Sequence, residues 1–363
     1  MANNFDLVSL ALQAAAPGNE VLFDDKNLPS IMVKIPKMSY ADLGLGSSTA
    51  VHPAFIVNGA EVDAIYISKY QNIVQNGRAY SLPGQDPAAG NINFDNARSY
   101  CEAKGAGWHL MTMMEWGLIA QWCKKNGTMP KGNNDYGKDH GDSIYQAIPS
   151  MARDSSNRRQ RVATGTGPLS WSHDGTPSGI WDLNGNVWEW CSGIRTVKGE
   201  VQILANNNGA DSSHVQTAAS AEWKAINASD GTLITPNGSG TTTGSVKMDW
   251  VSSHCQYDTT ISDSAPGGHS CTFESVTCSA NISAAAQLLL QALGIFKYDS
   301  TSGAYLGDYF YYNNAETERC FYRGGGWSSG AGAGVFYSSG RHPRSTSSAD
   351  IGFRSAFVKL PSA

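Results

Sequence analysis

The sequence predicts a loop-rich α+β fold with short strands and two main helices, on three observations. Of the 363 residues, 41% are hydrophobic, which is ordinary for a soluble globular protein and enough for one large or two medium domains. The chain contains 39 glycines and 10 tryptophans, a composition typical of many turns between short, well-anchored strands. Few segments have the three-to-four-residue apolar spacing of a helix.

Residues 1–29 are expected to form an N-terminal appendage. Apolar side chains between Phe5 and Ala15 are compatible with a short amphipathic helix, and Pro17-Gly18 would end it. This helix could contact a partner.

Two segments, 30–36 and 61–70, are rich in β-branched and aromatic residues and are predicted to be strands. A turn-rich loop at 77–90 follows them.

The pattern then becomes helical. Apolar residues at helical spacing follow Asn93, and either Asn93 or Asp95 is the candidate N-cap. A second helix is predicted from Thr112 to Lys125, because Thr112 and Glu115 have the spacing of a capping box. These are the two main helices.

Residues 126–180 are polar and glycine-rich, as expected of surface loops. The segment WDLNGNVWEW at 181–190 is the most distinctive of the chain. Its Asn184-Gly185 pair predicts a hairpin-type turn, and the bulky residues after it predict a strand. A further strand is expected at 198–205.

An insertion rich in Asn, Ser, Thr and Gly is expected at about 206–304, within a domain spanning 30–363. Near its end, Ser283 is a candidate cap for a helix at 284–293. An aromatic strand is predicted at 305–312.

Charge and cysteine content exclude several classes of function. The net charge is −5 and no basic cluster is visible, so a nucleic-acid partner is not expected. No apolar run is long enough to span a bilayer, and the N-terminus lacks the basic start of a secretion signal. The seven cysteines are interpreted as thiols of a reducing compartment, and a disulfide among Cys255, Cys271 and Cys278 is the one worth testing.

Residues 322–354 have rigid ends and a polar middle. RGGGW at 323–327 and IGFR at 351–354 combine turn glycines with large apolar anchors, and Phe336 is expected in the core. Between them, eleven positions carry residue types that core packing rarely selects and are expected at the surface. They are Ser328, Ser329, Gly332, Tyr337, Ser339, Arg341, His342, Thr346, Ser348, Ala349 and Asp350. By composition alone, an ordinary exposed loop explains the segment equally well.

Four segments resemble, in order, a known family. HLMTMMEW at 109–116 resembles the RLPTEAEW helix start of the formylglycine-generating-enzyme type of C-type lectin fold. WDLNGNVWEW resembles its GNVWEW segment, and RGGGW with GFR at 352–354 matches its terminal RGGSW and GFR frame. The resemblance covers about 30–195 and 305–358 and implies that fold.

The family contains enzymes and binding proteins. Formylglycine-generating enzymes carry a copper-binding cysteine pair just after the RGGSW tryptophan, where this chain has serine, glycine and alanine. Cys320 precedes the motif alone, and none of the eight histidines has the spacing of an iron site. We therefore expect no enzymatic activity and no cofactor.

The chain also resembles the variable proteins of diversity-generating retroelements, in which the segment between RGGxW and GFR is rewritten at template adenines. Codons rewritten from AAC never yield Lys, Glu, Gln, Met or Trp, and none of these five types occurs at 328–350. The resemblance implies a diversified ligand-binding region at about 322–354, with Tyr337, Arg341 and His342 as candidate hot spots.

The resemblance assigns a structural role to the rest of the frame. The scaffold residues are Arg323, Trp327, Trp188, Trp190, Gly352, Phe353 and Arg354. Some family members hold calcium near Asp182, Asn184, Asn186 and Glu189, although turn and cap roles explain the same residues.

The resulting hypothesis is a non-enzymatic receptor-binding protein of a phage tail or a cell surface. Its partner would be a protein or glycan on a target cell, with homo-oligomerisation or attachment to a phage tail left open and no membrane insertion. The alternatives are an oxidase of the formylglycine-generating type and a fixed structural or carbohydrate-binding tail module.

Overall fold

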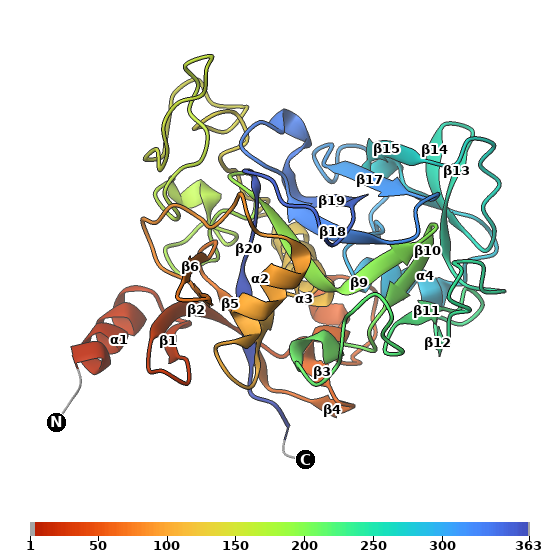
Figure 1. The fold of residues 1–363 in the computed structure, drawn as a ribbon, viewed down its shortest axis with the longest axis horizontal. Helices are drawn as coiled ribbons and strands as arrows, with labels where there is room; N and C mark the ends of the chain where they lie inside the picture. Colours follow the sequence, from red (N-terminus) through yellow and green to blue (C-terminus); the bar gives the residue numbers. More distant parts are fainter. Residues whose placement is uncertain (1–3, 362–363) are drawn as a thin grey trace.

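The computed structural model describes residues 4–361 and has the expected mixed architecture, with two main sheets and four α-helices in that part of the chain (Figure 1). The first three residues of the expected appendage and the last two of the expected domain lie outside the described residues.

A five-stranded sheet joins the beginning and the end of the chain. Its strand order is β1-β2-β5-β21-β8, and every neighbouring pair is antiparallel. The strands are β1 (Asn19–Phe23), β2 (Pro29–Pro36), β5 (Ala64–Ser68), β8 (Trp108–Leu110) and β21 (Ser355–Val358). The strands predicted at 30–36 and 61–70 are confirmed, and β1 adds an edge strand within the segment interpreted as an appendage. Two small hairpins, β3 (Ile56–Val57) with β4 (Ala60–Glu61) and β6 (Ile73–Gln75) with β7 (Arg78–Tyr80), lie outside this sheet.

A twelve-stranded sheet carries the C-terminal half. Its main order is β15-β17-β19-β18-β9-β10-β13-β14-β16. These strands are β9 (Trp188–Val197), β10 (Glu200–Ile203), β13 (Lys247–Val251), β14 (His254–Asp258), β15 (Gly268–Thr272), β16 (Thr277–Cys278), β17 (Tyr309–Asn313), β18 (Arg319–Gly324) and β19 (Gly334–His342). Three short strands branch from this path: β11 (Lys224–Ile226), β12 (Leu233–Ile234) and β20 (Ile351–Phe353).

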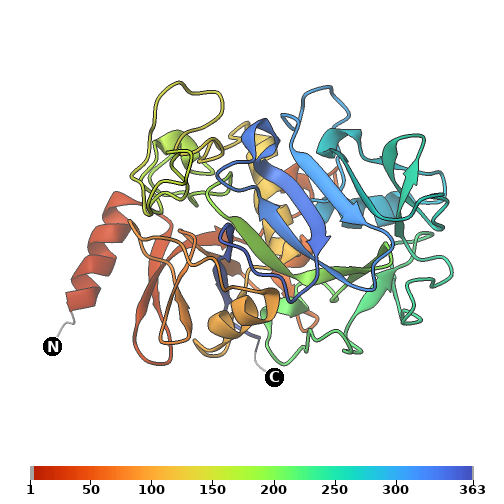
Figure 2. The ribbon, with the colours of Figure 1, turned by 45° about the horizontal axis from the view of Figure 1, so that its top comes forward.

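The helices begin where the sequence predicts. Asn93 caps α2 (Phe94–Glu102), and Thr112 with Glu115 forms the predicted capping box of α3 (Met113–Asn126). Ser283 caps α4 (Ala284–Ala292). The fourth helix, α1 (Asn4–Ala15), projects from one corner beside β1 (Figures 1 and 2).

Short 3₁₀ turns connect several of these elements. They are Ala41–Leu43, Pro53–Phe55, Leu169–Trp171, Asn208–Ala210, Phe273–Ser275 and Gly330–Gly332.

Helix α3 lies under the strands that carry the C-terminal segment. Its Trp116 is 1% exposed and donates an indole hydrogen bond to the Val335 carbonyl at 2.8 Å. Gly117 lets α3 approach α4 closely, because a Cβ there would lie 2.1 Å from the Ala292 carbonyl oxygen. The helix predicted from its capping box therefore forms the buried support of β18 and β19.

The segment interpreted as an insertion packs on the same core. Phe273, Val276, Ile282 and Leu290 belong to the main hydrophobic cluster of buried residues. β15 contacts β14 although the two strands lie near opposite ends of the strand order, so the large sheet curls toward closure. The loops expected at 126–180 contain one 3₁₀ turn and no named strand.

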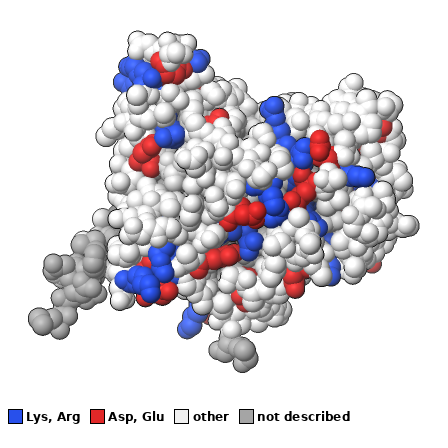
Figure 3. Space-filling view, viewed as in Figure 1, with Lys and Arg blue, Asp and Glu red and all other residues white. Residues whose placement is uncertain are grey.

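Over residues 4–361, no helix is long and apolar enough to cross a membrane. On the face seen in Figure 3, acidic and basic side chains are interspersed and do not gather into a basic patch.

Candidate binding surface

Both ends of segment 322–354 are fixed on one strand. Arg323 in β18 is in register with Glu189 of β9, and Gly352 in β20 is in register with the same Glu189 on the other side. β9 is the strand that contains the GNVWEW segment. The strands entering and leaving the segment therefore flank the same residue, although they are 29 positions apart in sequence.

The entering end is buried. Arg323 is 0% exposed and donates to the carbonyls of Gly294 at 2.9 Å and Val335 at 3.0 Å. Gly324 has a φ of +86°, and its missing side chain leaves room for the Leu183 carbonyl, 3.0 Å from where a Cβ would lie. Trp327 is 8% exposed and donates its backbone amide to the Asn186 carbonyl at 3.1 Å.

The leaving end is buried as well. Arg354 is 0% exposed and forms an ion pair with Glu189, which is 1% exposed. Phe353 and Trp190 are fully buried in a second hydrophobic cluster with Tyr322. Trp188, in register with Ile351, is half-buried and packs against that cluster.

Between these ends the chain forms three parts. A 3₁₀ turn at Gly330–Gly332 follows Trp327, and the Ser329 hydroxyl accepts a hydrogen bond from the Gly326 amide at 2.9 Å. Strand β19 then runs antiparallel to β18 and parallel to β17. Residues 343–350 form a loop that returns the chain to β20.

Nine of the eleven positions expected at the surface are exposed or half-buried there. The exposed ones are Ser328, Arg341 and Ala349, and the half-buried ones are Ser329, Gly332, His342, Thr346, Ser348 and Asp350. Most of the expected set is therefore accessible to solvent.

Tyr337 and Ser339 were expected at the surface, but both are buried, at 6% and 1% exposure. β19 lies between β17 and β18, so its side chains are covered from both sides. The Tyr337 ring stacks on Tyr309 at 5.5 Å between centroids and on Tyr322 at 6.5 Å. Burial raises the pKa of Tyr337. The ring belongs to the support of the surface.

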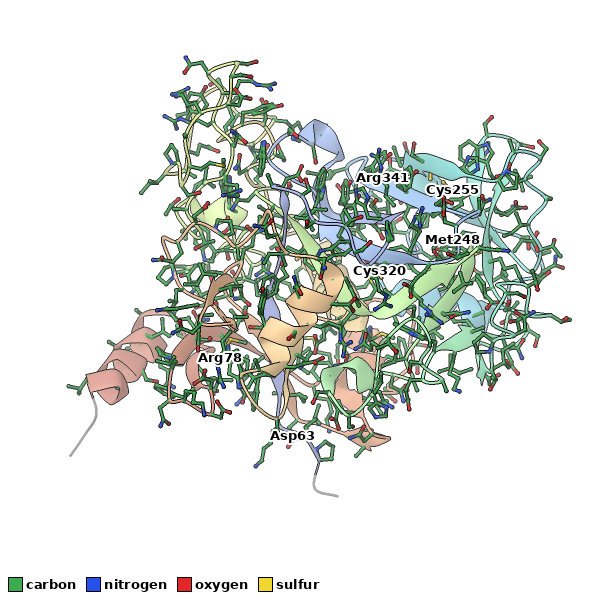
Figure 4. The ribbon with its side chains drawn as sticks, in the orientation of Figure 1. Asp63, Arg78, Met248, Cys255, Cys320 and Arg341 are labelled. Atoms are coloured by element: carbon green, nitrogen blue, oxygen red, sulfur yellow. The ribbon has the colours of Figure 1, made fainter. Side chains whose placement is uncertain are left out.

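Arg341 and His342 are the last two residues of β19, exposed and half-buried respectively, and Figure 4 labels Arg341. The Arg341 guanidinium is 5.8 Å from the Tyr311 ring centroid, a cation–π arrangement. His342 stacks on Tyr322 at 5.5 Å, and burial together with the charges of Arg341 and Arg319 lowers its pKa. An aromatic and a cationic group thus lie side by side at this edge.

The sequence did not predict that aromatic side chains of β17 lie beside Arg341. Tyr309 and Tyr311 of β17 are half-buried and stack at 6.3 Å between centroids. The aromatic strand was predicted, but its parallel pairing with β19 joins residues far apart in sequence, and no local pattern signals it.

A cavity of about 370 Å³ opens beside the start of β19. Asp308, Asn184, Ala333 and Val335 are among its lining residues. The Asp308 carboxylate accepts a hydrogen bond from the Phe336 amide at 2.8 Å, and burial raises its pKa well above the ordinary value. The cavity is thus lined by two buried acidic residues, Asp308 and Asp139, and by small or apolar residues near Ala333.

The side chains of the four residues considered for calcium form hydrogen bonds or an ion pair with different neighbours. Asp182 accepts from the Gly165 amide, and Asn184 accepts from the Asn134 side chain. Asn186 accepts from the Val162 amide and the Asn133 side chain, and both carboxylate oxygens of Glu189 bind Arg354. In residues 4–361 no group of three or more His, Cys, Asp or Glu side chains is arranged to hold a metal ion.

Two thiols on the strands that hold the ends of the segment are buried. Cys320 of β18 is 1% exposed and Cys191 of β9 is 0% exposed, and burial raises the pKa of both. A thiol with a raised pKa is a poor nucleophile and metal ligand at neutral pH.

Comparison with known proteins supports the expected fold. Residues 55–232, just under half of the chain, match the family described as Sulfatase-modifying factor enzyme 1-like domain. This match confirms the resemblance to the formylglycine-generating type, and the mixed architecture confirms the expected α+β, C-type lectin-like fold class. No curated protein matches the chain by sequence.

Several solved structures are similar over almost the whole chain. PvdO from Pseudomonas aeruginosa is 15% identical, with 94% of this chain and 98% of that chain covered and a TM-score of 0.36. Treponema denticola variable protein 1 is 12% identical, with 94% and 99% covered and a TM-score of 0.32. The Major Tropism Determinant P3c variant is 10% identical, with 93% and 71% covered and a TM-score of 0.33.

Proposed function

We propose that this chain is a non-enzymatic binding protein whose diversified surface, residues 328–350, recognises a protein or glycan receptor on a target cell. The division of labour within 322–354 carries the proposal. Both ends are buried and pair with β9, the strand that contains Glu189. Nine of the eleven positions expected at the surface are exposed or half-buried. Exposed side chains can change with stability effects usually within about 0.5 kcal/mol, so the fixed ends allow the surface to vary.

The chemistry of the surface fits recognition. It presents serines, glycine, arginine and histidine beside the half-buried tyrosines Tyr309 and Tyr311. Binding loops of antibodies combine the same types, because aromatic rings give rigid contact area and small polar residues give adaptable hydrogen bonds. Two of the similar solved structures are named a variable protein and a tropism determinant, and we propose a binding function of that kind for this chain.

Catalysis of the formylglycine-generating type is disfavoured by the residues present. Segment 328–350 contains no cysteine, and Cys320 of β18 and Cys191 of β9, the strand that holds both of its ends, are buried with raised pKa values. The enzyme alternative predicts that the protein, supplied with copper(I), oxygen and a reducing thiol, converts the cysteine of a thiol peptide to formylglycine with release of sulfide and water. We expect no such product by mass spectrometry.

We further propose that the protein works on a phage or prophage tail or at a cell surface.

A genomic observation tests the proposed diversification: DNA near the gene should hold a near-copy of the sequence coding for 322–354 and a reverse transcriptase gene. Differences between the two copies should coincide with adenines of the near-copy. A locus without such a copy would leave a fixed structural or carbohydrate-binding module as the better explanation.

A further inference from the structure

One arginine inside the segment is bound very differently from its neighbours. The guanidinium of Arg344 donates to both oxygens of Glu318, from Nε to Oε2 at 2.7 Å and from Nη2 to Oε1 at 2.8 Å. Its third nitrogen, Nη1, donates to Asp95 Oδ1 at 2.8 Å. The side chain is 16% exposed, and each of its three guanidinium nitrogens donates to a carboxylate.

These two carboxylates belong to the fixed frame. Glu318 immediately precedes β18, and Asp95 lies in the first turn of α2. Arg195 of β9 also binds Glu318, from Nη1 to Oε1 at 3.0 Å. Burial alone would raise the pKa of Glu318, but the hydrogen bonds and charges of Arg344 and Arg195 outweigh it and lower the pKa, so the acceptor is ionised at neutral pH.

The Arg344 backbone is held at the same place. Its carbonyl oxygen accepts a hydrogen bond from the Phe94 amide, the first residue of α2, at 3.1 Å. Main chain and side chain of Arg344 thus both join loop 343–350 to the helix, and the side chain also joins it to the sheet.

Three backbone carbonyls join the far end of the loop to the rest of the protein, and the Ser348 hydroxyl donates to the Asp350 carboxylate within the loop. The carbonyls of Ser348, Ala349 and Asp350 accept hydrogen bonds from Gly90 N, Arg161 Nη1 and Trp188 N, each at 2.8 Å. Carbonyl contacts are the same for any side chain. Positions 348–350 can therefore change without loss of these contacts, whereas at position 344 the contacts depend on the side chain.

We propose that Arg344 is a positioning residue that fixes loop 343–350, so that position 344 must stay arginine while the positions around it vary. The inference rests on the proposed function in treating this loop as part of the display. Lysine cannot replace Arg344, because an ammonium group lacks the planar fork that binds Glu318 through two nitrogens.

Hydrogen exchange of the whole chain tests this placement without any ligand. Arg344→Gln is compared with Arg341→Gln, the same change three residues away at an exposed arginine whose guanidinium lies over Tyr311. We expect Arg344→Gln to speed amide exchange of 343–350 by about tenfold or more, with β9 and β18 unchanged, and Arg341→Gln to leave the loop unchanged. Equal exchange in both variants would overturn the proposal, as would a loss of protection spread evenly over the domain.

Arg344→Lys keeps the charge and provides the second variant if Arg344→Gln folds poorly. It should reproduce the faster loop exchange at near-normal thermal stability, and normal loop protection in this variant would contradict the need for a guanidinium.

A nucleotide comparison gives an independent outcome. In the near-copy, the codon for position 344 should lack adenine in its first two bases, unlike the codons of the varying positions. Adenine at those bases would overturn the proposal. If no near-copy exists, the diversification proposal fails, whereas the exchange experiment still reports on Arg344.

Discussion

Arg354 and Glu189 form a two-bond ion pair inside the protein, with Nε 2.6 Å from Oε2 and Nη2 2.7 Å from Oε1. Arg354 also donates to the carbonyls of Ser68 at 2.9 Å and Trp181 at 3.0 Å. Ser68 belongs to the five-stranded sheet and Glu189 to the large one. One arginine, placed just after segment 328–350, therefore joins the two sheets and the WDLNGNVWEW segment. The hairpin predicted at Asn184-Gly185 is not formed, because β9 begins only at Trp188 and pairs with β10, β18 and β20.

Glu189→Gln should destabilise the protein by about 3–5 kcal/mol, because it leaves the Arg354 charge buried without its partner. The matched control is Glu61→Gln, which removes an exposed ion pair with Lys37 and should cost at most about 1 kcal/mol. Urea unfolding followed by tryptophan fluorescence measures both. A Glu189→Gln variant as stable as Glu61→Gln would show that the pair is not needed to join the sheets.

Tyr337→Ala should also cost about 3–5 kcal/mol, since the ring is 6% exposed and stacks between Tyr309 and Tyr322. Arg341→Ala, four residues later on the same strand, should change stability by no more than about 0.5 kcal/mol. The same urea measurement separates the two. If Tyr337→Ala were neutral, Tyr337 would belong with the varying surface, as its residue type first suggested.

Local sequence predicted what local physics determines. The capping box of Thr112 and Glu115 and the cap at Asn93 marked the helix starts, because a cap forms with the next three residues of the same chain segment. The GNVWEW and RGGGW segments marked the strands that fix the surface. Tyr337 and Ser339 were misplaced, because their burial depends on β17 and β18 lying on either side of them.

The Arg344 contacts could not be predicted for a related reason. Asp95 lies 249 residues away in sequence and Glu318 lies 26 away, so no spacing rule connects them. Arg341 and Arg344 look alike as letters in a polar segment. Only the fold shows that one faces two carboxylates and the other lies exposed beside a tyrosine.

Mild oxidation should form one disulfide, between Cys255 and Cys271. The two thiols share a hydrogen bond where β14 meets β15, and this hydrogen bond lowers the pKa of Cys271. The Cys271 thiolate attacks oxidised glutathione and releases one glutathione. Cys255 then attacks the Cys271–glutathione mixed disulfide and releases the second glutathione as a thiolate. Two protein thiols are thereby oxidised, and one glutathione disulfide is reduced to two thiols.

Intact-mass spectrometry should record a loss of about 2 Da. The free energy of unfolding should rise by about 3 kcal/mol, because the disulfide closes the loop between residues 255 and 271. Cys278→Ser should still form the bond, whereas Cys255→Ser should not. A bond that disappears in Cys278→Ser would place the reactive pair elsewhere.

Asp182 should make stability fall as the pH rises from about 4 to 7. Burial raises the pKa of Asp182 from 3.8 to about 6. Between these values the folded protein holds a proton that the unfolded chain has released, so the stabilisation is complete below the unfolded pKa and lost as pH passes 6. Asp182→Asn removes the titrating carboxyl group and its pH-dependent contribution to stability. Asparagine tolerates the left-handed backbone at φ 64°. The stability of the wild type minus that of Asp182→Asn, from urea unfolding, should decrease by about 2.4 kcal/mol between pH 4 and 7. The histidines cancel in this difference because both proteins contain them. A pH-independent difference would mean that Asp182 ionises normally in the folded protein.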